Sequence, residues 1–497
     1  MLLSELIESL SEKQQIGSGN PEITSIAYDS RRVDAGALFV CVRGERFDGH
    51  DFVDDALRKG ACAVAAENSA RIGNSHRGLP IVLVPDARRA MPVLANRFFG
   101  YPSRRIRLVG VTGTKGKTTT TYLVEGALRQ AGWRAGVIGT LGARIQGQFI
   151  PLDRTTPESV DLQKLLARMV SERVSAAIME VSSHALAMCR TEGCEYDVGI
   201  FTNLTHDHLD FHGTLDDYLE AKLTLFDTYP RSSKKRFTAV INADDPSSDR
   251  VRERTCGEVV TYGIRKPANI KAENVSATAD GVSFDVSCPA GQDHIDLKIG
   301  GVFNVYNSLA AIGAALSLGL DMEQLKAGLE SVTSVAGRFE SVDCGQDFGV
   351  IVDYAHSPDS LENVLRSARE LTSGRLIVVF GCGGDRDRAK RPVMGKIAAG
   401  LADVCVITSD NPRSEDPKAI IDEILTGTDG QHAEVQAIVD RREAIQQTLG
   451  LARPGDLVII AGKGHETYQI FRDRTVHFDD REVVREVLSS LGRGCAY

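Results

Sequence analysis

Short apolar runs alternate with longer amphipathic stretches over most of the chain. In its middle part the apolar runs are RLVGVTG, RAGVIGT, SAAIMEVSS, DVGIFTNL and FTAVINADD, and further on they are FGVIVDYAH, RLIVVFGCGG, ADVCVITSDNPR and GDLVIIAGKGHE. Buried strands that alternate with helices are typical of parallel sheets covered by helices on both faces. The pattern therefore predicts an α/β fold in both parts.

Weaker runs at the start of the chain and two breaks in the pattern predict three domains. The start holds strand-like ITSIAYDS and GALFVCVRG and a helix-like FVDDALRKG. Basic, proline-containing YPSRRIR predicts a first linker and SVTSVAGRFE a second, which gives domains at 1–103, 104–336 and 337–497. A chain of 497 residues is also too long for one hydrophobic core.

Composition narrows the class of protein. The chain is 42% hydrophobic and 25% charged, as in soluble globular proteins, and its net charge of −9 argues against nucleic acid or an acidic membrane as main partner. The N-terminus, MLLSELIESLSEK, has neither a signal-peptide pattern nor a membrane-spanning run. The ten cysteines are scattered without a C-x-x-C pair, which indicates reduced cysteines in a cytoplasmic protein.

Polar, glycine-bearing or charged clusters follow nearly all of these strands, where ligands bind in open parallel sheets. The most specific cluster is VGVTGTKGKTTTTYL, residues 109–123. Leu108–Val111 predicts a buried strand that leads into it. Apolar residues then recur with helical spacing at Val124, Ala127, Leu128 and Ala131. The cluster is therefore a glycine-rich loop between a strand and a helix.

Such a loop aims backbone N–H groups and the positive end of the helix at a bound anion. Lys117 could reach the outer phosphates of a nucleotide, and the Thr118 hydroxyl could ligate Mg²⁺. The standard spacing needs a glycine where Val111 stands, so we expect a tighter loop. A structural turn would need a glycine or two, but not Gly-Thr-Lys-Gly-Lys followed by four threonines. The stretch therefore predicts an ATP site.

A nucleotide-triphosphate site needs a second metal anchor at a strand end. Glu180 closes the run AAIME and can hold Mg²⁺ directly or through water, although an acid there is as often a solvated cap. The loop THDHLDFH after the next strand holds three histidines, which suggests zinc, but its spacing matches no zinc pattern and no cysteine is near. We expect one histidine to serve a phosphate-bound divalent metal.

The cluster GCGGDRD imitates a dinucleotide-binding fingerprint. That fingerprint, G-x-G-x-x-G, needs a glycine where Arg386 stands. The sequence therefore argues against a nicotinamide or flavin cofactor.

Ten motifs together carry a resemblance to a known family. In order they are GTKGKTTT, EVSSH, TNLTHDHLDFHG, YLEAKLTLF, FNVYNSLAA, GRFE, DYAHSPDS, GCGGDRD, DNPR and AGKGHE. Their order and spacing resemble the Mur ligase family along almost the whole chain. The resemblance implies a small N-terminal α/β domain that binds a UDP-sugar, a central phosphate-loop ATPase-like sheet, and a C-terminal Rossmann-like sheet that binds an amino acid.

The resemblance also implies an ATP-dependent amide ligase of peptidoglycan biosynthesis. Its small-molecule substrates would be ATP, UDP-N-acetylmuramoyl-L-alanyl-D-glutamate and meso-2,6-diaminopimelate, since DNPR resembles the members that add this amino acid. The substrate carboxylate would form an acyl phosphate, which the amine then attacks. We expect a cytoplasmic monomer. An L-lysine-adding enzyme, a folylpolyglutamate synthetase-like ligase and an ATPase without ligation remain as alternatives.

The same resemblance assigns residues to each substrate. Expected at ATP are Gly113, Thr114, Lys115, Gly116, Lys117, Thr118, Thr119, Asn304, Arg338 and Asp353. Expected at the muramoyl dipeptide nucleotide are Ser30, Thr155, Thr156, Ser182, Met188 and Arg190. Expected at diaminopimelate are Arg386, Asp410, Asn411, Pro412, Arg413, Gly462 and Glu466. From the residues alone, Asn304 and Asn307 are expected to be helix caps.

Four residues are expected to be catalytic: Lys117, Glu180, His208 and Lys222. From the residues alone, we interpret the lysine in YLEAK as an ordinary charge on the face of a helix. In the family, the matching lysine carries a carbamate formed with CO₂, and a carbamate can ligate Mg²⁺ where an ammonium would repel it. The resemblance therefore implies a Mg²⁺ site made by Thr118, Glu180, His208 and carbamylated Lys222.

Three departures from the family pattern affect the sugar-nucleotide contacts. Glu45-Arg46-Phe47 stands where related proteins often have His-Gln-Ala. Arg154 replaces an asparagine, and Met188 replaces a glutamine. The exact contacts near these positions therefore stay open.

Overall fold

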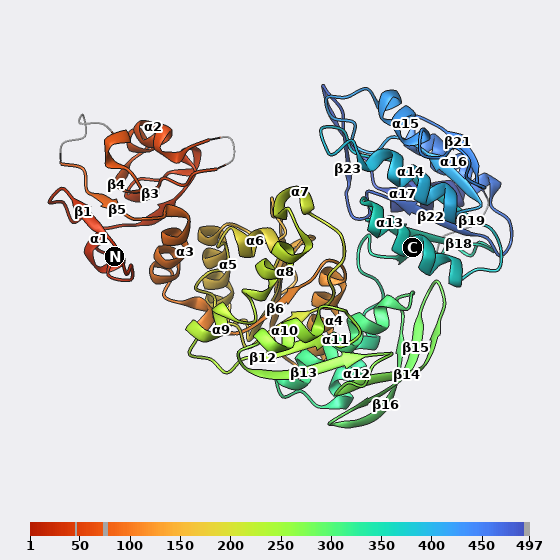
Figure 1. The fold of residues 1–497 in the computed structure, drawn as a ribbon, viewed down its shortest axis with the longest axis horizontal. Helices are drawn as coiled ribbons and strands as arrows, with labels where there is room; N and C mark the ends of the chain where they lie inside the picture. The colour runs from red at the N-terminus through yellow and green to blue at the C-terminus, as the bar shows by residue number, and fades with distance from the viewer. Residues whose placement is uncertain (45–46, 73–77, 492–497) are drawn as a thin grey trace.

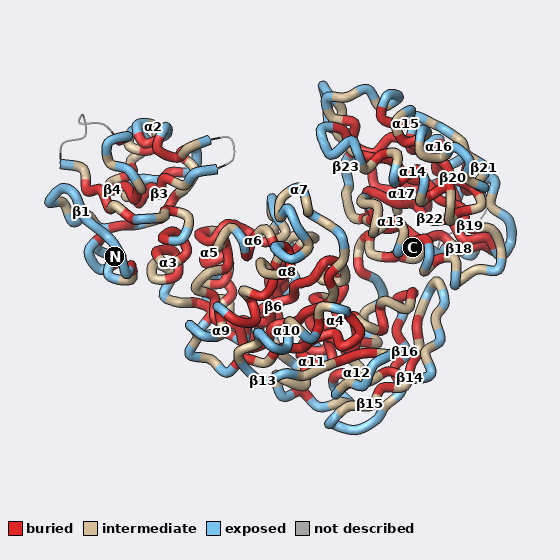
Figure 2. Tube along the Cα trace, in the orientation of Figure 1, coloured by how far each residue is buried: buried red, intermediate tan, exposed pale blue. Residues whose placement is uncertain are grey.

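The computed structural model describes residues 1–44, 47–72 and 78–491. Figure 1 shows three bodies, each with its own sheet: the N-terminal body in red, the central body in yellow and green, and the C-terminal body in blue. In Figure 2 the buried residues gather on the strands inside each body. None of the described helices is long and apolar enough to cross a membrane. The three-part α/β prediction is confirmed.

The N-terminal body is a five-stranded sheet in the order β1-β5-β4-β3-β2. Its strands are β1 Gln14–Ile16, β2 Ser25–Ala27, β3 Ala37–Val40, β4 Ala61–Ala66 and β5 Ile81–Leu83. Its helices are α1 Leu3–Ile7, α2 Val53–Arg58 and α3 Ala87–Phe98, with short 3-10 turns such as η1 Ser30–Arg32. The strands β2 to β5 are parallel and β1 is antiparallel.

The central body is an eleven-stranded sheet in the order β16-β15-β14-β13-β12-β11-β6-β10-β7-β8-β9. The strands are β6 Arg107–Thr112, β7 Ala135–Gly139, β8 Gly142–Ile145, β9 Gln148–Ile150, β10 Ala176–Glu180, β11 Val198–Phe201, β12 Thr238–Asn242, β13 Glu258–Gly263, β14 Ile270–Ala277, β15 Val282–Cys288 and β16 Gly291–Leu297. The helices are α4 Lys117–Gln130, α5 Ser159–Ser171, α6 Ser183–Ala187, α7 Leu209–His212, α8 Leu215–Leu223, α9 Thr228–Ser232, α10 Ser248–Arg254, α11 Phe303–Ser317 and α12 Met322–Glu330.

The parallel part of this sheet is buried on both faces. Val109 and Val111 of β6 pack on α4, α11 and α12, whereas Leu108 faces the opposite way and packs with α5 and α8. The two edges of the sheet depart from the predicted parallel arrangement, because β7-β8-β9 and β14-β15-β16 pair antiparallel. In β15 the buried and half-buried residues alternate, as they do where one face of a strand meets water.

The C-terminal body is a six-stranded sheet in the order β17-β18-β22-β19-β20-β21. The strands are β17 Glu340–Ser341, β18 Gly349–Asp353, β19 Leu376–Phe380, β20 Val404–Ile407, β21 Glu434–Ala437 and β22 Leu457–Ala461, and β23 Tyr468–Ile470 pairs with β24 Thr475–His477 as a separate hairpin. The helices are α13 Pro358–Glu370, α14 Lys390–Leu401, α15 Pro417–Leu425, α16 Arg441–Leu451 and α17 Asp480–Ser490. One apolar cluster joins α13, α14 and α15 to the sheet, and a second joins α16 and α17.

The cysteines depart from the expected pattern at one position. Cys344 is disulfide-bonded, so the expectation of reduced cysteines is wrong there. Eight others are free, among them Cys189 and Cys194, the pair closest in sequence.

Candidate active site

The phosphate loop lies at the carboxyl end of β6, between β11 and β10. Gly113 and Gly116 have φ angles of 142° and 83°, which side-chain-bearing residues rarely adopt. A Cβ on Gly113 would collide with Thr202, and one on Gly116 would collide with Asn307. The backbone of Lys115 donates to the Asn203 side chain over 2.8 Å. The loop is thus held from β11 and α11, and α4 begins at Lys117 as expected.

Two lysine ammonium groups share one carbonyl oxygen of this loop. Lys117 Nζ donates to the carbonyls of Gly113 at 3.0 Å and Thr114 at 2.9 Å. Lys222 Nζ, from α8, donates to the same Gly113 carbonyl at 2.9 Å and lies 4.1 Å from the centre of the Tyr218 ring. Among the described residues, neither ammonium has a carboxylate partner. This concentration of positive charge suits an anionic ligand.

The pKa values of these lysines reflect their position. Burial lowers the pKa of Lys117 to about 8, with Lys115 and Arg338 adding to the effect and Glu180 opposing it. Burial also lowers the pKa of Lys222 well below its usual value, and the neighbouring charge of Lys117 lowers it further. A buried amine with a lowered pKa spends more time neutral, and hence nucleophilic, at physiological pH.

Glu180 and His208 lie beside these lysines. The Glu180 carboxylate, at the end of β10, accepts hydrogen bonds from the backbone and hydroxyl of Thr140 over 2.8 Å and 3.0 Å. His208 has a left-handed φ of 54°, and its ring lies 6.2 Å from the Tyr218 ring that Lys222 covers. Burial lowers the pKa of His208, and the charges of Lys117 and Lys222 contribute. Thr118 is buried in the first turn of α4.

Within the described residues, no group of three or more His, Cys, Asp and Glu side chains is placed to hold a metal ion. The expected Mg²⁺ set contains only two such residues, Glu180 and His208. A hydroxyl and a modified lysine would have to complete it. Its fit therefore depends on the chemistry of Lys222.

The amides at the start of α11 are not caps. Val302 is the N-terminal cap residue and makes no side-chain cap bond. Asn304 donates instead to the Gly300 carbonyl over 2.7 Å and accepts from the Asn307 side chain over 2.8 Å. Asn307 in turn accepts from Thr120 of α4 over 3.3 Å. The cap interpretation is wrong: Asn307 links α11 to α4, and Asn304 bonds to Asn307.

Arg338 and Asp353 meet where the chain enters the C-terminal body. The Asp353 carboxylate accepts from the backbone of Phe339 over 2.7 Å and of Ala355 over 2.8 Å. Burial raises the pKa of Asp353, and Arg338 opposes that rise. The Arg338 guanidinium lies 4.9 Å from the Tyr354 ring centre, and its Nε has no hydrogen-bond partner. Asp353 thus holds the GRFE turn to the end of β18.

Residues expected at the muramoyl dipeptide form one cluster beside Glu180. The Thr156 hydroxyl donates to the Glu180 carbonyl over 2.7 Å and accepts from the Ser182 backbone over 3.1 Å. Thr155 shares a 3.1 Å hydrogen bond with the hydroxyl of Thr140, the residue that also holds the Glu180 carboxylate. The loop before α5 and the start of α6 are therefore tied to Glu180.

Arg190 and Met188 complete this cluster. Arg190 is buried, donates to the Thr156 carbonyl over 3.4 Å and pairs with Glu158 at 3.0 Å. Its other nitrogen lies 3.1 Å from the Met188 sulfur. Arg154 also reaches Glu158, at 3.8 Å, and half of its side chain is exposed. The two departures from the family pattern thus lie on either side of Arg190.

Ser30 lies apart from that cluster, in the N-terminal body. It is buried in η1, and its carbonyl accepts from Lys59 over 3.0 Å. Its neighbours Tyr28 and Arg32 both contact Asp161 of α5. The face that carries Ser30 therefore adjoins the central body, and Glu45 and Arg46 lie outside the described residues.

The residues expected at diaminopimelate lie on three loops at the carboxyl edge of the C-terminal sheet. We call them the acceptor cluster. Arg413 donates to the Gly384 carbonyl over 2.9 Å. The Asn411 side chain donates to Glu466 over 2.8 Å and accepts from the Ile470 backbone over 2.9 Å. Gly462 leaves room for the Asp410 carboxylate, which a Cβ would crowd.

Sequence reasoning missed two residues of this acceptor cluster. The ammonium of Lys463 is fully buried and pairs with Glu466 at 3.1 Å. Tyr468 of β23 lies beneath that ammonium, with its ring centre 5.6 Å away. Lys463 stands inside the quoted motif AGKGHE, so the motif was the available signal. Arg386 is exposed and donates only to the carbonyl of Asp385, over 3.1 Å.

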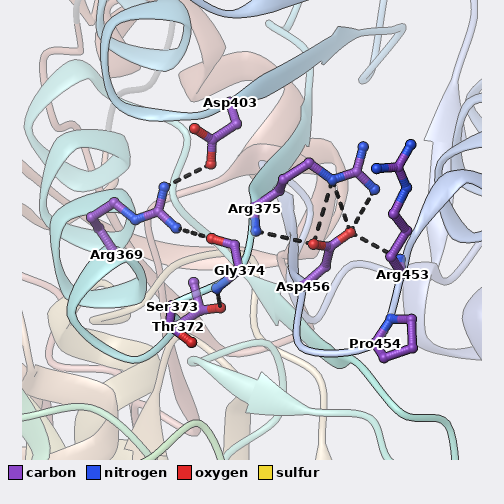
Figure 3. Close-up of a pocket in the computed structure, with 9 residues that line it drawn as sticks. All are labelled: Arg369, Thr372, Ser373, Gly374, Arg375, Asp403, Arg453, Pro454 and Asp456. Carbon is purple, nitrogen blue, oxygen red and sulfur yellow. Dashed lines mark hydrogen bonds and ion pairs between the residues drawn. The ribbon is translucent and has the colours of Figure 1, made fainter.

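A cavity of about 590 Å³ lies at the opposite edge of the same sheet, where β19 and β22 begin. Its arginines are largely paired: Arg369 with Asp403 at 2.7 Å and Arg375 with Asp456 at 2.6 Å. Figure 3 shows these two pairs and the separate guanidinium of Arg453. Since Asp403 and Asp456 also accept backbone N–H groups at the strand starts, we interpret the pairs as structural.

The central sheet carries a glycine-rich loop with buried cations, and the C-terminal sheet carries a charged cluster at its strand ends. This arrangement indicates an ATP-dependent ligase built from α/β domains. Family models agree: "Mur ligase family, catalytic domain" matches residues 22–99, "Mur ligase middle domain" residues 111–315, and "Mur ligase, glutamate ligase domain" residues 337–464. The chain belongs to the Mur ligase family.

Relatives and solved structures of similar sequence or fold support this assignment. The "UDP-N-acetylmuramoyl-L-alanyl-D-glutamate--2,6-diaminopimelate ligase" of Geobacillus thermodenitrificans is 48% identical over 94% of this chain and 95% of its own. The protein of the same name from Syntrophomonas wolfei is 47% identical over 98% and 99%. A solved structure with that name covers 99% of this chain and 100% of its own, at 32% identity and a TM-score of 0.70. Mycobacterium tuberculosis folylpolyglutamate synthase shares the fold at 18% identity and a TM-score of 0.61.

Proposed function

We propose that this protein joins meso-2,6-diaminopimelate to UDP-N-acetylmuramoyl-L-alanyl-D-glutamate at the expense of ATP, in peptidoglycan biosynthesis. The names of the full-length relatives support this proposal. The observation that carries it is the paired arrangement of sites. The lysines at the phosphate loop have no carboxylate partner among the described residues, and a charged cluster lies at the second sheet. ATP would bind the loop, and the amino acid would bind the cluster.

The reaction would proceed in two balanced steps. An oxygen of the substrate's terminal carboxylate attacks the γ-phosphorus of ATP, the bond to the β–γ bridging oxygen breaks, and ADP leaves. The amine of diaminopimelate then attacks the acyl carbon, phosphate leaves and the amine loses a proton. Lys117 and the loop N–H groups would stabilise the negative charge that spreads over the transferred phosphoryl group. No nucleophilic side chain is needed.

Lys222 would act as a carbamate. A neutral amine can add to the carbon of CO₂ and release one proton, which leaves an anionic carbamate. The lowered pKa of Lys222 favours that neutral amine, and the product would replace a cation that crowds Lys117 by an anion that attracts it. Thr118, Glu180, His208 and the carbamate would then hold Mg²⁺, which when bound neutralises phosphate charge.

Arg413, Asn411 and Glu466 would recognise the distal end of diaminopimelate. That end carries a carboxylate beside an ammonium, whereas the same end of lysine carries an ammonium alone. A guanidinium can grip the carboxylate with two parallel hydrogen bonds, and Glu466 offers a counter-charge to the ammonium. Asp410, Pro412, Gly462 and Arg386 would shape the same pocket. The L-lysine-adding alternative would leave Arg413 unpaired.

The remaining assignments complete this proposal. Ser30 would meet the UDP end of the nucleotide sugar, and Thr155, Thr156, Ser182, Met188 and Arg190 would meet its peptide end. Asn304, Arg338 and Asp353 would complete the ATP site together with Gly113, Thr114, Lys115, Gly116 and Thr119. We place the domain boundaries at 1–103, 104–336 and 337–497, and propose a cytoplasmic monomer.

The decisive test offers ATP with each acceptor and measures phosphate release and product mass. Release that requires both the muramoyl dipeptide nucleotide and diaminopimelate is the expected result. Release with neither would favour a plain ATPase. Release with a folyl substrate and glutamate would favour the folylpolyglutamate alternative.

A further inference from the structure

One buried arginine holds two loops of the acceptor cluster together. Arg391, in the first turn of α14, is fully buried. Its guanidinium grips the Glu415 carboxylate with both nitrogens, over 2.8 Å and 2.9 Å. The first loop is 383–387 of GCGGDRD and the second is 411–415 of DNPRSE. A two-pronged arginine–carboxylate contact fixes orientation as well as distance.

Glu415 connects Arg391 to the first loop. Its carboxylate accepts from the Asp385 backbone over 2.6 Å, while Arg391 also reaches the Gly383 carbonyl at 3.4 Å. The loops touch directly as well, since the Gly384 backbone donates to the Asn411 carbonyl over 2.9 Å. A Cβ on Gly384 would collide with the carbonyl of Pro412. The two loops therefore form one unit.

Each loop contains a side-chain-bearing residue in a left-handed conformation. The φ angle is 54° at Asp385 and 52° at Arg413. This conformation is strained for a residue with a side chain and persists only when its surroundings hold it there. Here Arg391 and Glu415 supply the surroundings, and the Arg413 guanidinium is aimed at the Gly384 carbonyl, 2.9 Å away.

We propose that Arg391 is a positioning residue for acceptor choice: through Glu415 it holds the turn that aims Arg413. This inference rests on the proposed function, because Arg413 is the group that would distinguish diaminopimelate from lysine. Because the Arg391 side chain is fully buried, we assign it no contact with a substrate. Its loss would leave Arg413 present but free to leave the orientation in which it meets a distal carboxylate.

The charges around Arg391 and Glu415 favour a positioning role for Arg391 over a role in packing alone. The Arg391 guanidinium holds the pKa of Glu415 at about 2, so the pair stays ionised at every working pH. Glu423 accepts from the same Arg391 nitrogen, Nη1, that donates to Glu415, at 2.9 Å, and it also contacts Arg388, but neither loop. Glu423 is therefore a partner that can be changed without cutting the link to Arg413.

The experiment measures kcat/KM for diaminopimelate and for L-lysine in wild type, Arg391→Lys, Arg391→Met and Glu415→Gln. We expect the preference for diaminopimelate to fall about tenfold or more in these variants, as for loss of one charge-assisted pair. The KM for diaminopimelate should rise, while the KM values for ATP and the muramoyl dipeptide nucleotide stay within about twofold. Arg391→Lys keeps the charge and serves if Arg391→Met fails to fold.

A double-mutant cycle with Arg413→Ala separates positioning from general damage. If Arg391 acts through Arg413, Arg391→Lys should cost no further preference once Arg413 is gone. Additive losses of preference, or an unchanged preference in a folded Arg391→Lys variant, would overturn the inference.

Two matched controls change comparable charges elsewhere. Glu423→Gln removes the other partner of Arg391, and Arg375→Met breaks the ion pair with Asp456 at the opposite edge of the sheet (Figure 3). Both should lower stability and leave the preference unchanged. If Arg375→Met lowers the preference as much as Arg391→Met, the effect is general and the inference fails. A wild type without any preference would instead contradict the proposed function.

Discussion

Among the described residues, the buried cations of the phosphate loop have no carboxylate partner, whereas those of the acceptor cluster are paired with carboxylates. At the loop, Lys117 and Lys222 donate only to backbone carbonyls within the described part of the chain, and both have lowered pKa values. At the cluster, Lys463 pairs with Glu466 at 3.1 Å and Arg391 with Glu415 at 2.8 Å. A cation removed from water without a counter-charge is costly until an anion arrives.

The difference matches the ligands that we propose. ATP and an acyl phosphate bring several negative charges, so a loop with surplus cations gains from them. Diaminopimelate is a zwitterion and brings both signs, so a cluster that is already balanced can receive it without rearranging its charges. The phosphate loop has surplus positive charge until an anion binds, and we call it the unfinished site. The charges of the acceptor cluster are already paired, and we call it the preformed site.

Removing a cation from the unfinished site should have the largest effect. Lys117→Ala should slow ligation by about 100-fold or more, because the transferred phosphoryl group loses a charge partner. Acceptor-dependent phosphate release is the measurement. Lys115→Ala is the matched control: Lys115 already pairs with Asp207 at 3.0 Å, so its loss should cost less. Near-normal turnover of Lys117→Ala would remove the loop from the ATP site.

Lys222 tests whether the unfinished site is completed by a carbamate. Lys222→Ala should lose about 100-fold or more in rate, and added acetate should restore part of it by supplying the missing carboxylate. The control is Lys235→Ala, whose ammonium already pairs with Asp197 at 2.5 Å. That variant should not respond to acetate. Full activity of Lys222→Ala in acetate-free, CO₂-free buffer would contradict the carbamate.

At the preformed site the effect should fall on selectivity rather than on rate. Arg413→Ala should lose about one to two powers of ten in preference for diaminopimelate over L-lysine, as one charge-assisted pair disappears. The measurement is the ratio of the two kcat/KM values. Arg472→Ala is a useful control, since this exposed arginine only donates to the Ser414 carbonyl. If Arg413→Ala keeps the full preference, Arg413 does not read the distal carboxylate.

Local sequence patterns predicted the features that local structure determines. The apolar run before Gly113 forms β6, and α4 starts at Lys117, because a strand, a glycine turn and a helix are set by neighbouring residues. The strands that end in EVSSH, DNPR and AGKGHE are also found where the apolar runs placed them. The roles of the residues in these motifs stay predictions.

Contacts between distant segments could not be read from the sequence. Lys222 and Gly113 are 109 positions apart, and the helical pattern around YLEAK gives no sign that one face meets the loop. Arg391 in KRPVMG looks like a surface charge until the fold buries it under Glu415. The sequence analysis did not predict the outer antiparallel strands. Their alternating pattern is a weaker signal for a strand than the continuous apolar runs of the parallel strands.

The smallest expected effect concerns protons, and it distinguishes the two sites directly. Burial holds the pKa of Lys117 at about 8 in the free protein, and the phosphates of a bound nucleotide should raise it. Below about pH 8 the ammonium is protonated in both states, so binding takes up no proton there. Above it the complex holds more protons than the free protein, so binding takes up protons, and affinity falls by at most about tenfold per pH unit.

Calorimetry of ADP binding in two buffers of different ionisation enthalpy measures that uptake, in CO₂-free solution with a chelator so that neither carbamate nor metal contributes. We expect an uptake of up to about one proton at pH 9 and close to none at pH 7. Lys117→Arg supplies the control, because a guanidinium stays protonated throughout and should take up none. Equal uptake in both proteins would assign the proton to another group. The acceptor cluster offers no comparable group in Arg391, because its guanidinium pairs with Glu415 and stays protonated.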